Sequence, residues 1–157
     1  MNADNGELQE LYRDLILDHA RNPRNFRRLE DATHTAEGIN PLCGDKLRLY
    51  LIVDASDQVI DVGFEGSGCA ISMASASLLT ETVSNLSVKE ADACFNSVTD
   101  RLTKQTSNDA APATVNLSKL RALDGVRAHP SRIKCATLAW HALHAALKHS
   151  PSSATTE

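Results

Sequence analysis

The sequence has few aromatic residues, no CxxC pair and no excess of positive charge. Aromatic side chains make up 4% of its 157 residues, and the formal net charge at pH 7 is −4. Nucleic-acid binding draws its affinity from clustered Lys and Arg, so this composition argues against a nucleic-acid partner. No apolar run approaches the ~20 residues of a membrane helix, and the opening MNADNGELQE lacks the basic and apolar regions of a signal peptide. We therefore expect a cytoplasmic protein without a membrane partner.

Cysteine is also scarce, with only Cys43, Cys69, Cys94 and Cys135 in the chain. Their spacing excludes a zinc ribbon or a thioredoxin-type motif, and disulfides are not expected in a reducing compartment. A free cysteine is most often a small buried hydrophobic residue. This interpretation suits Cys94, which lies inside an expected helix without a ligand-like neighbour, but the sequence around the other three departs from it.

Hydrophobic spacing divides the chain into helices and strands. The length suits one domain, placed at residues 1–150, and the polar tail 151–157 is expected to be disordered. Helices are expected at 7–21, 70–85, 87–106 and 117–123 and from Pro130 onward, with a loop at 107–116. Ser87 and Glu90 form a capping-box pattern. Strict alternation predicts a β-hairpin of strands 46–54 and 58–65, and a weaker strand signal covers 33–39.

Cys43 lies in the turn sequence NPLCGD, two residues before Asp45. In an extended segment the two side chains would point to the same side, where a thiolate and a carboxylate repel each other unless a cation lies between them. A plain surface turn remains an equal alternative from its composition. Cys69 follows Gly-Ser-Gly at the start of the helix at 70–85, where the helix dipole favours the thiolate. Its alternative interpretation is a small residue that packs at a crowded helix start.

Cys135 lies near the start of the last helix, beside Arg132 and Lys134, whose positive charges are expected to favour its thiolate. Three thiolates and one carboxylate make a four-ligand set that suits tetrahedral Zn²⁺ or iron in a cluster. The long separations along the chain exclude a local zinc knuckle and predict a site assembled by the tertiary fold.

Four stretches of the chain resemble the U-type iron–sulfur cluster assembly family, which includes IscU, the N-terminal domain of NifU, and SufU. They are LYRDLILDHARNPRN at 11–25, NPLCGD at 40–45, FEGSGCAISMASASLL at 64–79 and RIKCATLAWHAL at 132–143. Classical scaffolds of this family have a His before the third cysteine, whereas Lys134 stands there in this chain. Together with the longer segment between the second and third cysteines, this makes the chain most similar to SufU-type members.

The resemblance implies a fold, a metal and a role. The implied fold is α+β, with a small three-stranded antiparallel sheet packed against about five helices and the metal site at one end. The implied ligands of Zn²⁺ are Cys43, Asp45, Cys69 and Cys135. The family also implies that Cys43 accepts a persulfide sulfur from a cysteine desulfurase of the SufS type and that downstream iron–sulfur assembly proteins or apoproteins receive the product.

Two other functions remain open at this point. The same four residues would hold a transient [2Fe–2S] cluster if the protein is an assembly scaffold, or zinc alone if it is a structural module. The carboxylate argues against a structural module, because structural zinc sites mostly use Cys and His.

The roles of four further polar residues stay open. Arg132 is either an electrostatic aid to the site or a surface arginine. His141 and His144 are expected to be solvated on a helix face, and His129 is not expected to be a ligand.

Overall fold

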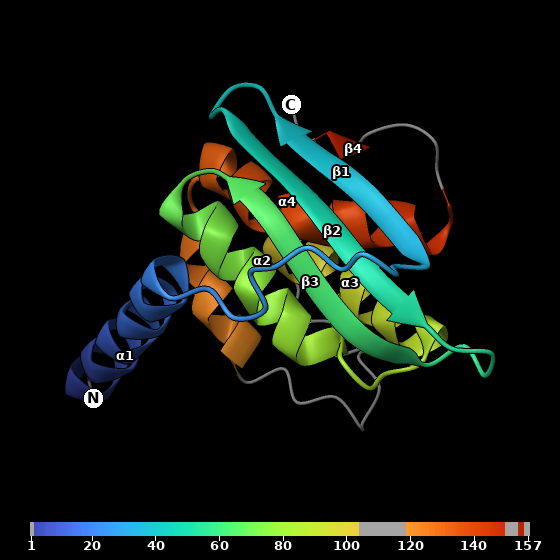
Figure 1. Cartoon of the computed structure of the whole chain (residues 1–157). Coiled ribbons are helices and arrows are strands. Elements are labelled where there is room, and N and C mark those ends of the chain that lie inside the picture. Colours follow the sequence, from blue (N-terminus) through green and yellow to red (C-terminus); the bar gives the residue numbers. More distant parts are fainter. Residues whose placement is uncertain (1, 104–118, 150–153, 156–157) are drawn as a thin grey trace.

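The computed structural model describes residues 2–103, 119–149 and 154–155, and places the helices behind one face of a four-stranded sheet (Figure 1). In chain order the elements are α1 (Asn2–Arg21), β1 (His34–Asn40), β2 (Asp45–Val53), β3 (Val59–Ser67), α2 (Ala70–Val83), α3 (Val88–Thr103), the 3₁₀ helix η1 (Lys119–Val126), α4 (Pro130–Leu147) and β4 (Ala154–Thr155). The α+β class predicted from the sequence is confirmed. None of the described helices is long and apolar enough to cross a membrane.

The sheet has the strand order β3-β2-β1-β4. β1, β2 and β3 form the antiparallel meander that the alternation predicts, and Asn40 pairs with Asp45 at the last rung between β1 and β2. The expected three strands become four, because Ala154 and Thr155 pair in parallel with β1. β1 is an edge strand of the meander, and its unpaired backbone groups can pair with any extended segment. A strand of two residues is too short to show alternation in the sequence. The other residues of the expected disordered tail lie outside the described residues.

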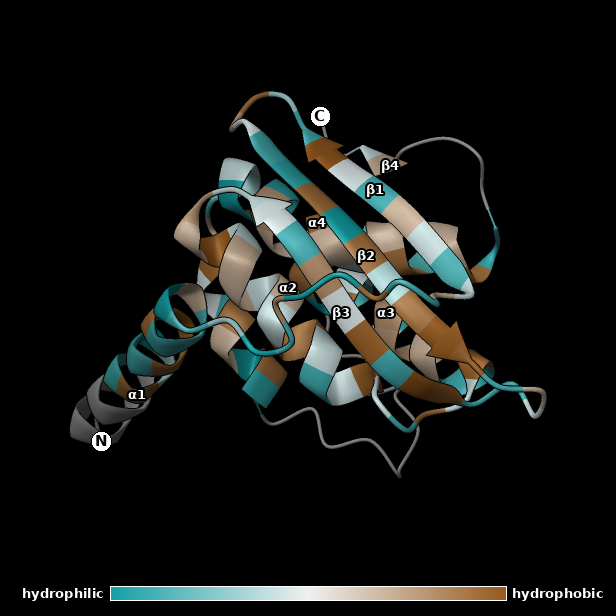
Figure 2. Cartoon of the chain, in the orientation of Figure 1, coloured by the Kyte–Doolittle hydropathy of each residue, from teal (hydrophilic) through white to brown (hydrophobic). Residues whose placement is uncertain are grey.

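The core lies between the sheet and the helices behind it. Leu47, Leu49 and Leu51 of β2 are nearly fully buried, while Lys46 and Arg48 beside the first two are exposed. This alternation is visible in the first half of the strand in Figure 2. α4 packs against β1 and β2, and α2 packs against β3, α1 and α4. Trp140 of α4 is fully buried, and its indole N–H donates to the hydroxyl of Ser75 on α2 at 3.1 Å. This contact fixes the two helices that carry two of the site's cysteines.

Most helix boundaries follow the expected signals. The capping box at α3 is confirmed, because the Glu90 N–H donates to Ser87 Oγ at 3.0 Å and the Ser87 N–H donates to Glu90 Oε1 at 3.1 Å. α2 ends at Val83 rather than Asn85, because the backbone of the C-cap residue Ser84 is extended (φ −61°, ψ 131°), and Asn85 follows with a left-handed φ of 72°.

Three other helix boundaries differ from those expected from the sequence or are not tested by the structure. α1 begins at Asn2, since apolar spacing marks only the packed part of a helix. The helix expected at 117–123 is the 3₁₀ helix η1, which starts its described course at Lys119. The expected last residues of α3, 104–106, and the loop at 107–116 lie outside the described residues.

Candidate metal centre

The turn between β1 and β2 presents Cys43 at one end of the sheet. The Cys43 N–H donates to the backbone carbonyl of Asn40 at 3.3 Å, and Gly44 adopts a left-handed φ of 71°. The turn that the sequence predicts here is confirmed, and Cys43 and Asp45 therefore do not lie along one continuous extended segment. The left-handed glycine reverses the chain in one step and still brings Cys43 close to Asp45. Cys43 is exposed at the turn, whereas Asp45 is only 1% exposed at the start of β2.

The buried carboxylate of Asp45 lies against the start of α2. Its Oδ1 accepts a hydrogen bond of 2.8 Å from the backbone N–H of Cys69. Cys69 is the N-cap of α2, and its Sγ accepts from the backbone N–H of Ser72 at 3.5 Å. A Cβ at Gly68 would come within 2.7 Å of Asp45 Oδ1, so only glycine leaves room for this carboxylate. The Gly-Ser-Gly sequence before Cys69 thus serves the close approach of β2 to the helix start.

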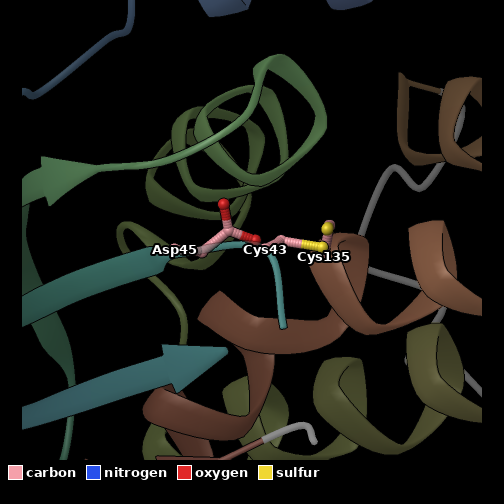
Figure 3. A group of neighbouring side chains, drawn as sticks. All are labelled: Cys43, Asp45 and Cys135. Atoms are coloured by element: carbon pink, nitrogen blue, oxygen red, sulfur yellow. The ribbon is translucent and has the colours of Figure 1, made fainter. Parts of the chain in front are cut away.

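Cys135 completes the cluster from the second turn of α4, where it is 3% exposed. The donor atoms of Cys43, Asp45 and Cys135 all lie within 4.8 Å of one another (Figure 3). Cys69 reaches the same carboxylate, with its Sγ 4.0 Å from Asp45 Oδ2. The structure therefore brings together the four residues that the sequence singled out, from a hairpin turn and two helices.

The donor set fits a tetrahedral metal ion. Zn–S bonds of about 2.3 Å and Zn–O bonds near 2.1 Å place neighbouring donors about 3.6–3.8 Å apart. The donors of Cys43, Asp45 and Cys135 lie within 4.8 Å of one another, and Cys69 Sγ lies 4.0 Å from Asp45 Oδ2, so both values are close to this spacing. Three sulfur atoms and one carboxylate oxygen suit Zn²⁺ or iron in a cluster rather than Mg²⁺ or Ca²⁺, which prefer oxygen. The arrangement could hold such an ion with Cys43 on its solvent side.

Burial dominates the titration of Cys135. The pKa of this thiol is raised far above its usual range by desolvation first, and then by hydrogen bonds with Asp45, Cys69 and Cys43. The expectation that Arg132 and Lys134 favour its thiolate is therefore wrong for the metal-free site, because neither charge compensates the burial of the sulfur. Metal ligands must be deprotonated, so a bound cation would itself be what ionises this thiol.

Residues 11–99 match the family model described as the NifU-like N-terminal domain. The chain belongs to this family. Similar curated proteins include the zinc-dependent sulfurtransferase SufU of Bacillus subtilis, 41% identical over 139 residues that cover 88% of this chain and 90% of the relative. The iron–sulfur cluster assembly scaffold protein IscU of Streptococcus pyogenes is 36% identical and covers 94% of this chain and 89% of its own.

Solved structures agree with this NifU-like assignment. The crystal structure of FiSufU, a SUF-system protein from Fervidobacterium islandicum AW-1, matches with a TM-score of 0.77 at 30% identity. The match covers 85% of this chain and 94% of that one. The similarity to this solved structure therefore extends over most of the chain.

Two polar residues near the start of α4 in this NifU-like chain stay outside the donor cluster. Arg132 is exposed one turn before Cys135, and in the described part of the chain its guanidinium has no ion-pair partner. His129 is the exposed N-cap residue of α4, with no side-chain cap bond. Neither is placed among the four donors.

His141 and His144 depart from the expectation of a solvated helix face. Both rings pack on Phe95 of α3, and His144 Nδ1 lies 2.7 Å from Asp92 Oδ1. The contact between α3 and α4 covers this side of the helix, which a spacing of three residues does not reveal.

Two further residues of the NifU-like chain are buried, and only one of them contacts the cluster. Cys94 is fully buried in α3, and burial raises the pKa of its thiol to about 11, which agrees with the structural role predicted for it. Sequence reasoning missed Asn40, whose buried side-chain amide contacts both Asp45 and Cys135. Its place at the head of NPLCGD was the available signal.

Proposed function

We propose that this chain is an iron–sulfur cluster assembly protein of the SufU type that holds Zn²⁺ through Cys43, Asp45, Cys69 and Cys135. We further propose that Cys43 accepts sulfur from a cysteine desulfurase of the SufS type. Support comes from the donor cluster and from similarity to a relative named a zinc-dependent sulfurtransferase. Downstream assembly proteins or apoproteins would receive the sulfur or the cluster.

The contrast between Cys43 and the other donors carries this proposal. Cys43 is exposed on a four-residue turn, whereas Cys69 caps a helix and Cys135 is buried in one. A partner enzyme must bring its own persulfide sulfur within bonding distance of the acceptor. A thiol on an exposed turn meets that requirement at little cost, while a helix-borne thiol would have to disturb core packing.

The transfer itself needs no electron donor or acceptor. The Cys43 thiolate attacks the outer sulfur of the desulfurase persulfide, a new S–S bond forms on Cys43, and the desulfurase cysteine leaves as a thiolate. Zinc, when bound, would keep the thiols deprotonated and protect them from oxidation. Arg132, exposed one turn before Cys135, would assist electrostatically where the partner docks.

The scaffold function is the second candidate, since a [2Fe–2S] cluster would be cargo on the same four donors. It is favoured by the similarity to IscU of Streptococcus pyogenes. Lys134 stands before Cys135 where classical scaffolds have His, and this favours sulfur acceptance instead. A purely structural zinc module is the weakest candidate, because Asp45 is a carboxylate and Cys43 is open to solvent.

Persulfide mapping tests the proposal directly. The zinc-loaded chain is incubated with a SufS-type desulfurase and cysteine, persulfides are trapped by alkylation, and the modified cysteines are identified by mass spectrometry. We expect persulfide on Cys43 in the parent and in a Cys94→Ala control, and none at this turn in Cys43→Ser. Persulfide mainly on Cys69 or Cys135 would refute the assignment.

The metal content separates the two leading candidates. The protein is purified without added metal and then treated anaerobically with iron and sulfide. One zinc per chain without a visible chromophore supports sulfur acceptance. A labile visible chromophore, together with no persulfide on any cysteine, supports the scaffold.

A further inference from the structure

The side chain of Asn40 is buried between two of the proposed ligands. Asn40 ends β1 with 0% exposure. Its Nδ2 donates to Asp45 Oδ2 at 3.4 Å and to Cys135 Sγ at 3.6 Å. Among the described residues its Oδ1 has no hydrogen-bond partner. The amide is therefore held from its N–H side alone, by one ligand on β2 and one on α4.

The chemistry of the neighbours fixes the orientation of this amide. The reverse orientation would place a carbonyl oxygen against a carboxylate oxygen and a sulfur, all of them electron-rich acceptors. With Nδ2 toward them, both N–H bonds meet acceptors, and these bonds strengthen when the acceptors carry negative charge. Leaving a carbonyl unpaired in the core is costly, so the contacts on the N–H side must outweigh that cost.

The three sulfur atoms of the cluster differ in the N–H bonds that they accept. Cys69 Sγ accepts from the backbone of Ser72 and Cys135 Sγ accepts from Asn40. In the part of the chain that the structure covers, no N–H donates to Cys43 Sγ. An N–H bond draws charge from a thiolate and weakens it as a nucleophile, so the protein lowers the reactivity of two sulfurs and leaves the third unchanged.

We propose that Asn40 is a positioning residue that joins Asp45 to Cys135 and leaves Cys43 as the most nucleophilic sulfur of the site. The selection of Cys43 rests on the proposed sulfur-transfer function, whereas the joining of the two ligands does not. A backbone contact adds to this role, because the carbonyl of Asn40 accepts from the Cys43 N–H and anchors the turn. One residue thereby sets the positions of three of the four donors.

Two substitutions of Asn40 remove its N–H donors while keeping its size. Asn40→Leu removes all polarity, and Asn40→Asp keeps the planar shape, which secures the test if the leucine variant does not fold. The matched control is Thr80→Val on α2. Thr80 is also fully buried; its hydroxyl accepts from Asn25 Nδ2 at 3.0 Å and donates to the Ser77 carbonyl at 2.7 Å. This change therefore removes hydrogen bonds away from the cluster.

Three measurements on the full chain report on the site without relying on activity. In zinc-loaded protein, we expect both Asn40 variants to release zinc to a chromophoric chelator about 10-fold or more faster than the parent. In Co²⁺-loaded protein, the sulfur-to-cobalt charge-transfer band should move to longer wavelength. Alkylation mapped by mass spectrometry should rise several-fold at Cys135 relative to Cys43. Thr80→Val should match the parent in all three.

The outcomes separate this inference from the proposed function. Parent-like zinc release and cobalt spectra in both Asn40 variants would overturn the positioning role, even if Cys43 of the parent carries persulfide. The same changes in Thr80→Val would also overturn it, since general loosening would then explain them. Altered release and spectra in the Asn40 variants, with no persulfide on the parent, would uphold the positioning role and reject sulfur transfer.

Discussion

Replacing Gly68 by alanine probes how tightly the Asp45 carboxylate is seated at the start of α2. The added Cβ would lie 2.7 Å from Asp45 Oδ1 and 3.0 Å from Ser72 Oγ. Ordinary contact begins at 3.4 Å, so the carboxylate would have to retreat by about 0.7 Å, the difference between 3.4 and 2.7. The Ser72 hydroxyl can rotate away, but the Asp45 side chain is buried and held by the amide of Asn40.

The retreat of the carboxylate sets the size of the effect. The bond from the Cys69 N–H to Asp45 Oδ1 would lengthen from 2.8 Å to beyond hydrogen-bond range. A hydrogen bond to a charged group contributes about 1.5–3 kcal/mol. We therefore expect Gly68→Ala to lower the free energy of unfolding by about 2 kcal/mol, which corresponds to about 4–8 °C in Tm for a chain of this length.

Gly125→Ala is the matched control for this substitution. A Cβ at Gly125 would meet nothing within 4 Å, and its φ lies outside the left-handed range. This variant should be neutral or slightly stabilised, because alanine reduces the entropy of the unfolded chain. Thermal melts of both variants, with and without zinc, are compared by circular dichroism. If Gly68→Ala melts within a degree of Gly125→Ala in both states, the carboxylate is not confined as described.

Four further expectations follow from the same structure. Cys94→Ala should keep one zinc per chain, because Cys94 lies in the core of α3, and loss of zinc by metal analysis would disprove the ligand assignment; removal of zinc from the parent should itself lower Tm, since a ligand of the native state adds stability. Asp45→Ala should keep or tighten the metal, because removing the more exchangeable carboxylate leaves a static site, yet it should stimulate a desulfurase less than the parent does; equal stimulation would show that Asp45 has no such role. Burial lowers the pKa of His19, whose Nδ1 lies 2.7 Å from Ser77 Oγ, so the unfolded chain takes up this proton first as pH falls. Stability in urea should therefore be unaffected by His19 above about pH 6.5 and decline below it, and His19→Asn should reduce that decline; an unchanged pH profile would contradict the shift.

The parts predictable from the sequence are those with a short-range signal. Alternation located β2 and β3, the Ser87–Glu90 pattern located the start of α3, and the Gly-Ser-Gly before Cys69 located the start of α2. The four candidate ligands were singled out because each sits in a distinctive local sequence, and the fold brings them close together. Their spacing alone did not determine their geometry, since Cys43 and Asp45 meet across the left-handed Gly44 of the predicted turn and not along an extended segment.

The parts that escaped prediction depend on tertiary contacts. β4 exists because β1 has a free edge, and no pattern in two residues announces it. The rings of His141 and His144 are partly covered because Phe95 of α3 lies over them. The charges beside Cys135 suggested an ionised thiol, but burial by the surrounding elements has the larger effect. In the sequence Asn40 is indistinguishable from an ordinary turn residue, because its amide contacts with Asp45 and Cys135 exist only in the folded chain.

The donors lie on three segments that are far apart along the chain, and this has a consequence for the order of folding. Before the β1–β2 hairpin, the start of α2 and the start of α4 have come together, any ion meets at most one or two of the four donors at a time. An incomplete set of that kind binds weakly, so metal would be captured late, by a chain that is already largely folded. Once bound, the ion would tie the sheet to both helices across long loops, much as a disulfide does. Loss of metal would then free the hairpin turn from the helices before the hydrophobic core opens.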